Sequence, residues 1–437
     1  MLRLQVGSAA LGALLLTSVP CWAQGGGAGG VFLDPDKVLR WSDSAKGKNA
    51  AKMNRLRTAK GKTAESADLA YVSIPSLCRE AKKLLDAGEK LPPEMKNLGG
   101  ITQLQYIFVY PETNDLIIAG PAEDPASDDP HRVLGASSGR PMLRLDDLAV
   151  CLRVLGPGKS PTPFGCSIDM PQNGLANMQA ASQKIGSVSG FNNDLVAKAL
   201  AKAVGLQDVR FFGVPEDTNA AYVCIEADYI LKRISHARLK APVPAVKSYL
   251  ALMRTGDGAY NRWWFTPNYE SVRVSEDGLA YELRSKGLKV ECSSSQSTDD
   301  APPGPGAKKF AELVTQNFEG LENGLASFAD LSNICDLTVL AAIIRRDELD
   351  KKTNNGMKWL IDPEGYKVAT RATPRQVEPI ANTKNMGSTL AINVGGVSID
   401  ADGVARSQQK DAKLKAKTKR PTKSWMLRDA KESAEGG

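Results

Sequence analysis

The chain has 437 residues, of which 42% are hydrophobic and 24% are charged, and its formal net charge is +7. This is globular composition with length for two or three cores, and the mean hydropathy of −0.26 excludes a protein that crosses a membrane many times. His131 and His236 are the only histidines, so one chain cannot build a three-histidine zinc site, an HExxH helix or a multi-histidine iron site. No motif specifies a reaction, and we expect no cofactor and no metal.

The N-terminus has the parts of a secretory signal peptide. Arg3 precedes an apolar run at residues 9–19, and cleavage is expected after the small residue Ala23, with Gln24 as the alternative last residue. The run is shorter than the roughly 20 residues that span a bilayer, and no other apolar stretch approaches that length. A lipoprotein anchor at Cys21 is disfavoured because Pro20 precedes it, and a buried N-terminal helix is the alternative. We therefore expect a protein exported to the periplasm or the exterior, without transmembrane insertion.

Removal of the signal leaves an even number of cysteines, which permits up to three disulfides: Cys78, Cys151, Cys166, Cys224, Cys292 and Cys335. None belongs to a C-x-x-C motif, so neither a thioredoxin-type redox pair nor a zinc ribbon is expected. Cys151 and Cys166 flank a Gly/Pro-rich connection and form the pair predicted first. The alternative is that all six are small buried hydrophobic residues.

Positive charge is concentrated in two segments, and the rest of the mature chain is acidic. Residues 37–62 hold nine Lys or Arg against one Asp, and residues 401–437 hold ten against five Asp or Glu. The tail has little hydrophobic content and is predicted to be disordered. It either binds a polyanion or is a solvated appendage, and its only nearby aromatic residue, Trp425, makes nucleic acid an unexpected partner. The candidate polyanion-binding residues are Lys410, Lys413, Lys415, Lys417, Lys419, Arg420 and Lys423.

Two twelve-residue segments near opposite ends resemble each other. Residues 29–40 and 395–406 match at seven of twelve positions, and each pattern predicts a short strand, an Asp-x-Asp turn and a second strand. We expect two edge hairpins that can pair with each other. Asp400, Asp402 and Gly403 also suggest a calcium loop, but the closing glutamate is missing, so a turn is preferred.

The first body segment has α+β patterning. Its predicted elements, in chain order, are a strand at 69–73, a helix at 76–87, a hairpin of 103–110 with 115–120, a strand at 141–145 and a helix at 147–155 capped by Asp146.

The second segment continues the α+β pattern. Its elements are helices at 172–185 and 193–204, a strand at 209–214, a helix at 217–237, β-rich segments at 262–265, 271–275, 279–284 and 288–292, and then helices at 308–322 and 335–349.

These patterns predict an α+β fold of two subdomains with short mixed or antiparallel sheets and packed helices, followed by a disordered basic C-terminal tail. The predicted divisions are a signal peptide (1–23), a Gly-rich linker with a short strand and a basic arm (24–66), two α+β subdomains (67–155 and 156–292), a low-complexity loop (293–306), a helical and terminal strand region (307–406) and the basic tail (407–437).

Several sequence blocks resemble a secreted planctomycete-type family, the domain-of-unknown-function family 1598. They occur in the family's order at residues 101–110, 139–150, 166–169, 212–218, 226–229 and 262–265. The resemblance covers roughly residues 30 to 400. It implies export and a bacterial source, and no activity or catalytic residue.

Two motifs with catalytic potential have simpler interpretations. Gly135-Ala-Ser-Ser-Gly139 fits G-x-S-x-G, but a strand rather than a helix is predicted after it, so a turn is preferred to a nucleophile elbow; nothing orients the nearby His131. The paired carboxylates of Asp146 and Asp147 are interpreted as cap and first-turn residues of a helix.

The candidate ligand-binding residues are Arg262, Trp263, Trp264, Tyr269 and Glu226. Consecutive residues of a strand face opposite sides, so one of the two tryptophans is expected in the core, and the other, beside Arg262, suits stacking on a sugar ring or a peptide. Core packing on both faces is the alternative. Glu226 is the least explained charge in an apolar stretch, while Asp228 is expected to pair with Lys232.

Two functions remain open. The preferred one is a non-catalytic binding or scaffold protein of the cell envelope, held by its basic arms to an anionic polymer or to another envelope protein. The alternative is an extracytoplasmic hydrolase with Glu226 or Asp169 as general base, which needs a second carboxylate roughly 5 to 10 Å away.

Overall fold

The structure is a computed structural model that describes residues 31–42, 68–126, 129, 131–186, 193–254, 257, 260–294, 302–384, 389–415, 421 and 424–429. The predicted signal peptide, most of the first basic segment and residues 295–301 of the low-complexity loop lie outside these residues.

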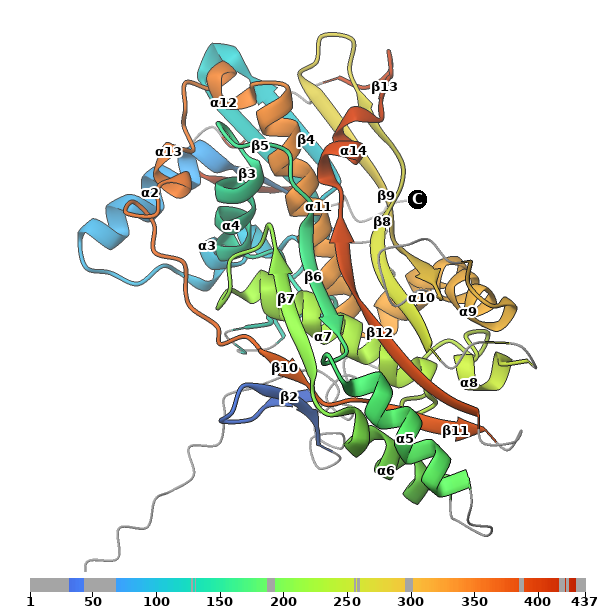
Figure 1. Ribbon diagram of the computed structural model, residues 1–437. Coiled ribbons are helices and arrows are strands. Elements are labelled where there is room, and N and C mark those ends of the chain that lie inside the picture. The colour runs from blue at the N-terminus through green and yellow to red at the C-terminus, as the bar shows by residue number, and fades with distance from the viewer. Residues whose placement is uncertain are drawn as a thin grey trace, which may run out of the picture.

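One mixed sheet organises the fold, with most helices packed on one of its faces (Figure 1). Its strands are joined in the order β1-β2-β10-β7-β6-β12-β8-β9-β4-β5-β3-β14, with β11 and β13 attached to β12 and β8. The α+β class is confirmed. Strands from both predicted subdomains share this sheet, because β4 pairs with β9.

The strands are β1 (Val31–Leu33), β2 (Val38–Trp41), β3 (Asp68–Ser73), β4 (Tyr106–Tyr110), β5 (Asp115–Ala122), β6 (Phe164–Asp169), β7 (Gln207–Phe212), β8 (Tyr260–Val274), β9 (Ala280–Ser293), β10 (Gln376–Val377), β11 (Ala381–Lys384), β12 (Thr389–Ile399), β13 (Gln408–Lys410) and β14 (Met426–Asp429).

The helices that bear on the argument are α2 (Ile74–Asp86), α4 (Leu145–Leu155), α5 (Gly174–Gly186), α6 (Asn193–Val204), α7 (Asn219–Ser235), α9 (Pro305–Gln316), α10 (Phe318–Gly324), α11 (Ala326–Arg346) and α14 (Ala401–Arg406). Shorter helices are α3 (Pro93–Lys96), α8 (Tyr249–Leu252), α12 (Leu349–Lys352) and α13 (Lys358–Ile361).

Local sequence accounts for the ends of several elements. The hydroxyl of Ser73 accepts a hydrogen bond from the Ser76 N–H and caps α2, and Asn114 takes a left-handed conformation in the β4–β5 turn. The predicted cap of α4 is wrong, because the helix begins at Leu145 with Arg144 before it and without a side-chain cap. The predicted strand 141–145 is reduced to an isolated bridge at Pro141, since Arg144 and the residues around it turn into the helix.

The main core lies between the sheet and α2, α4, α7, α9, α10 and α11. α11 contradicts the expectation that no internal segment approaches membrane length, because its length and apolar composition would suffice to cross a bilayer. Its apolar window is entirely buried inside the protein, so in this structure it is a core helix.

A second, smaller core lies on the opposite face of the sheet. It contains Tyr71, Phe108 and Ile117, and Leu414 and Leu427 of the C-terminal region pack against it. Since β3, β4 and β5 alternate, these side chains point away from the helices. The C-terminal region therefore covers part of this outer face.

The tail contains ordered strands, which corrects the prediction of disorder for residues 408–410 and 426–429. β13 continues the pairing of β8, and β14 forms an antiparallel edge strand against β3. Arg428 fixes β14 by donating to Asp124 at 2.7 Å and to the carbonyl oxygen of Gly99 at 3.1 Å. Leu414, Met426 and Leu427 make apolar contacts with the cores of the protein, which the basic composition of the tail did not indicate.

The two similar segments adopt different structures. Residues 31–41 form the predicted hairpin, in which Asp34 accepts hydrogen bonds from the N–H groups of Asp36 and Val38. In the second segment Asp400 instead accepts from the Gly403 N–H and starts helix α14, so the predicted second strand is wrong. The two segments do not pair with each other, because β2 joins β10 and β12 joins β6 and β8.

All six cysteines predicted for the mature chain are free thiols in the structure, which contradicts the Cys151–Cys166 disulfide. Five are buried and Cys292 is partly exposed. The alternative of small buried hydrophobic residues therefore describes them, because α4, β6, α7 and α11 each place a thiol in the main core.

Candidate functional site

Trp263 and Trp264 lie on opposite faces of the sheet, as strand alternation requires. Trp263 is 2% exposed and packs edge-on against Tyr249 and Phe310, so its ring belongs to the core. Trp264 is partly exposed and points to the outer face, opposite to Tyr249 and Phe310. Of the two predicted binding tryptophans, only Trp264 therefore presents its side chain to solvent.

The pairing registers place Trp264 in a transverse row of outer-face residues. β12 puts Gly396 beside it, and β9 puts Glu291 on its other side. The row continues through β6 and β7, so that it consists of Arg210, Ser167, Gly396, Trp264 and Glu291. A Cβ on Gly396 would lie 2.1 Å from the carbonyl oxygen of Cys166, which leaves this position without a side chain.

Arg262 lies two residues from Trp264 on the same face. Its Nη2 donates to Asp169 Oδ1 at 2.6 Å, and this ion pair reaches from β8 to β6 across β12. Val394, the β12 partner of Arg262, is fully buried although it points to the same face. The ion pair therefore forms one border of the surface around Trp264, and the Lys289–Glu291 pair, at 2.8 Å, forms another.

Glu226 lies on the other side of the sheet, in a buried network. It is 0% exposed, and its Oε2 accepts a hydrogen bond from Arg132 Nη2. The same guanidinium donates through Nε to Asp330 at 2.8 Å. The loop that carries Arg132 is thereby bound to both α7 and α11, and Glu226 contributes to the packing of the core, not to the outer face.

The network continues toward the N-termini of α4 and α7. Arg371 donates to Asn219, Asn219 donates to Asp147 at 2.8 Å, and the Arg371 guanidinium lies 3.5 Å from the centre of the Tyr222 ring. Burial raises the pKa of Asp147 to about 7 despite Arg144 nearby. Burial and the cations Arg371 and Arg144 lower the pKa of the half-buried His131.

The partly buried Tyr269 is bound to the buried Asp336. Its hydroxyl donates to Asp336 Oδ1, and burial raises the pKa of Asp336 to about 7. The phenol is thus used inside the protein and is not part of the surface around Trp264. In the same region Arg140 donates to Glu322 at 2.9 Å.

The general-base candidates are separated by the sheet. Asp169 lies on the outer face and is bound to Arg262, whereas Glu226 lies in the helical core. Asp330 is the second carboxylate near Glu226, but Arg132 stands between them and all three are at most 4% exposed. Asp146 and Asp147 also have hydrogen-bond partners within the fold. Asp146 accepts a hydrogen bond from the Tyr366 hydroxyl at 2.7 Å, and Asp147 accepts one from Asn219.

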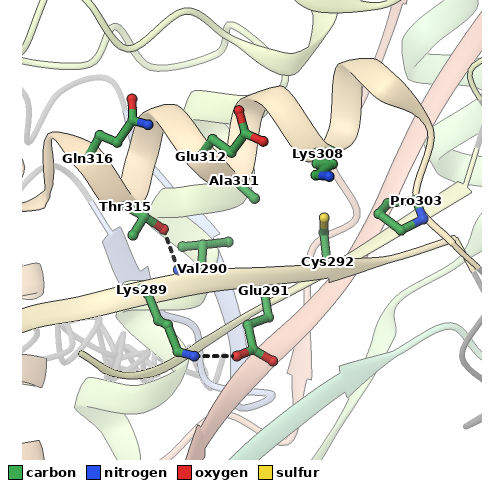
Figure 2. A pocket seen from close by; sticks show the side chains of 10 residues that line it. All are labelled: Lys289, Val290, Glu291, Cys292, Pro303, Lys308, Ala311, Glu312, Thr315 and Gln316. Carbon is green, nitrogen blue, oxygen red and sulfur yellow. Dashed lines mark hydrogen bonds and ion pairs between the residues drawn. The ribbon is translucent and has the colours of Figure 1, made fainter. Parts of the chain in front are cut away.

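A groove runs between β9 and α9 (Figure 2). It has a volume of about 530 Å³ and is lined by Lys289, Val290, Glu291, Cys292, Pro303, Lys308, Ala311, Glu312, Thr315 and Gln316. The Thr315 hydroxyl accepts from the Val290 N–H at 3.0 Å and thereby covers part of the β9 edge. Figure 2 shows the Cys292 sulfur directed toward the helix that carries Lys308.

The remaining motifs are structural. The G-x-S-x-G segment is a turn, as predicted, held by Glu123, whose Oε2 accepts from the N–H groups of Ser137 and Ser138. Asp402 pairs with Arg345, which leaves no calcium loop at Asp400–Gly403. Within the described residues no group of three or more His, Cys, Asp or Glu side chains is arranged to hold a metal ion.

The candidate polyanion-binding residues are divided by the fold. Lys410 Nζ donates to the carbonyl oxygens of Ser275 and Glu276, so this ammonium group is used in a turn. Lys413 and Lys415 are exposed. Lys417, Lys419, Arg420 and Lys423 lie outside the described residues.

The sequence alone did not reveal that Glu226 is paired with Arg132, or that Asp330 shares the same guanidinium. Arg132 and Asp330 are far from Glu226 in the chain, and only tertiary packing brings them together. The Arg262–Asp169 pair was missed for the same reason. A single charged residue within an apolar helical stretch was the sequence feature that could have indicated a buried ion pair.

A family model matches residues 166–249 of the chain. No curated protein and no solved structure matches the chain. The matching segment runs from β6 through α5, α6, β7 and α7, and it includes Asp169, Arg210 and Glu226. The planctomycete origin and the wider extent of the resemblance stay predictions. Residues 166–249 of the chain match the model of a family of proteins of unknown function, DUF1598.

Proposed function

We propose that this protein is an exported, non-catalytic binding protein of the cell envelope, which uses the outer face of its sheet for one ligand and its basic segments for an anionic polymer. The observation that carries the proposal is the position of Trp264. It is a large aromatic side chain on the solvent side of the sheet, with the Arg262–Asp169 pair as its neighbour. Aromatic faces bordered by hydrogen-bonding groups are typical of sites for ring-shaped polar ligands.

The buried ionisable groups support a non-catalytic role. Glu226, Asp330 and Asp147 each have a cationic or amide partner within the fold, and each is nearly inaccessible to solvent. A carboxylate that acts as a general base must reach its substrate. These groups serve stability, and Asp169, the general-base candidate on the outer face, is held in an ion pair with Arg262 at 2.6 Å.

The concentration of charge supports electrostatic attachment. The basic segments carry most of the excess of Lys and Arg, and Lys413 and Lys415 on the ordered part of the tail are exposed. Polyanion binding of this kind weakens steeply with salt, because each neutralised charge releases a counterion.

The test is partition of the protein between a purified envelope fraction and the supernatant at low and high salt. The tail is not truncated, because β14 belongs to the sheet; instead six cations are replaced by Gln, at Lys413, Lys415, Lys417, Lys419, Arg420 and Lys423. Lys410 stays because it binds turn carbonyls. The matched control replaces six exposed lysines of other elements: Lys82, Lys83, Lys90, Lys96, Lys240 and Lys247.

We expect high salt to release most of the wild-type protein, and the tail variant, unlike the control, to be released already at low salt. Equal retention of both variants would contradict attachment through the tail. A wild-type protein that stays in the supernatant at every salt concentration would contradict an envelope role altogether.

A further inference from the structure

We infer that the ligand of the outer sheet face is a neutral polysaccharide, one sugar ring of which stacks on Trp264. This inference rests on the proposed function and names the class of ligand for the same surface. We draw it from the charges around Trp264, from the spacing of the transverse row and from the aromatic ring itself.

The charges on this face cancel. Arg262 is neutralised by Asp169 at 2.6 Å, and Lys289 is neutralised by Glu291 at 2.8 Å. Arg210 lies at the end of the row. Its side chain forms no hydrogen bond or ion pair with another side chain among the described residues. Asp208, two positions along the same strand, carries the opposite charge, so the formal charges of these two residues sum to zero. An anionic ligand would gain no net attraction here, whereas a hydroxyl-rich neutral ligand finds both donors and acceptors.

The row has the dimensions of an extended ligand. β12 and β6 lie between β8 and β7, so Trp264 and Arg210 are separated by three strand spacings, or about 14 Å. Gly396 offers no side chain next to Trp264, and Ser167 offers a hydroxyl further along. The distance is wider than one sugar ring, which favours a chain of linked rings over a single monosaccharide.

The aromatic ring provides the anchor. A planar indole packs against the apolar face of a pyranose ring through dispersion and burial of apolar area, neither of which requires charge. The exposed hydroxyls of such a ring can exchange hydrogen bonds with the Arg262–Asp169 pair at its border. Binding of this kind is insensitive to salt, in contrast to attachment through Lys413, Lys415 and their neighbours.

The test is retention of the full chain on insoluble cellulose, chitin and starch, with soluble polygalacturonate as the anionic comparison. We expect retention on at least one neutral polymer that persists at high salt. Trp264→Ala should weaken this retention at least tenfold and Trp264→Phe less, because phenylalanine keeps an aromatic face. Leu85→Ala, which also shortens an exposed apolar side chain, should leave it unchanged.

Absence of retention on all three neutral polymers would overturn the inference, as would equal retention of Trp264→Ala and Leu85→Ala at matched thermal stability. Retention that salt abolishes, or that the six-residue Gln variant of the tail abolishes, would also overturn it, since charge would then be the cause. In each case attachment to the envelope fraction can persist, so failure of this inference is distinguishable from failure of the proposed function.

Discussion

The guanidinium of Arg132 donates a hydrogen bond of 2.8 Å to the carboxylate of Asp330, 198 residues further along the chain. A second nitrogen of the same group binds Glu226, and all three side chains are buried. Burial alone would lower the pKa of Arg132, but Glu226 and Asp330 raise it above its usual value. One cation thus joins a loop to two core helices.

Arg132→Met should lower the free energy of unfolding by about 3–5 kcal/mol, because it leaves two buried carboxylates without their cation. Urea unfolding at pH 8 and pH 5 measures this, and the loss should be smaller at pH 5, because burial raises the pKa of Asp330 and favours its neutral form. Arg132→Met combined with Glu226→Gln and Asp330→Asn should recover part of the stability at pH 8. A triple variant no more stable than the single one would refute the ion-pair explanation.

Asp147 should make the protein less stable as pH rises from about 4 to about 7. Its pKa is about 7 in the folded protein, against about 3.9 in an unfolded chain. Between these values the folded state binds more protons, so the free energy of unfolding falls with increasing pH. Asp147→Asn should flatten this decline in thermal melts, and addition of Asp336→Asn should flatten it further, because the pKa of Asp336 is also about 7. An unchanged slope in both variants would show that these carboxyls are not the cause.

The adjacent tryptophans should differ sharply in their effect on stability. Trp263→Ala removes a ring packed between Tyr249 and Phe310 and should cost about 3–5 kcal/mol. Trp264→Ala removes an outer-face ring and should cost less than about 1 kcal/mol. Chemical denaturation of both variants decides the matter, and similar losses would mean that both rings are packed as core.

Removal of residues 424–437 should destabilise the protein by at least about 2 kcal/mol and promote aggregation. The deletion takes away β14, exposes the edge of β3 and uncovers apolar contacts of Met426 and Leu427. Thermal melts and light scattering are the measurements, and a shorter deletion of residues 431–437 is the control because it spares β14. Identical behaviour of the two deletions would argue against a structural role for this strand.

Among the described cysteines, Cys292 should be the first to react with a maleimide under native conditions. It is partly exposed beside Lys308, whereas Cys78, Cys151, Cys166, Cys224 and Cys335 are buried. Burial raises the pKa of Cys292 to about 11, so its labelling should be slow and should accelerate as the pH increases. Peptide mass spectrometry before and after unfolding identifies the labelled sites. A cysteine that stays unlabelled after unfolding without reductant would reveal a disulfide.

Local sequence determined much of the secondary structure. The helices at α2, α5, α6 and α7 and the β4–β5 and β8–β9 hairpins follow from apolar periodicity and turn residues, which act over a few positions. The opposite orientations of Trp263 and Trp264 also follow from strand alternation alone. These features depend on neighbours in the chain, so a single sequence is sufficient to predict them.

The tertiary structure determined which residues of distant segments come into contact. The second Asp-x-Asp segment starts a helix because Ala401 and Ala405 pack in the core, although its sequence resembles that of a hairpin. The partners of Glu226 and Arg262 come from distant segments, and the basic tail is ordered where Leu414 and β14 find an apolar face and a strand edge. Burial and charge pairing between distant segments determine these contacts. Such interactions leave no local pattern in the sequence.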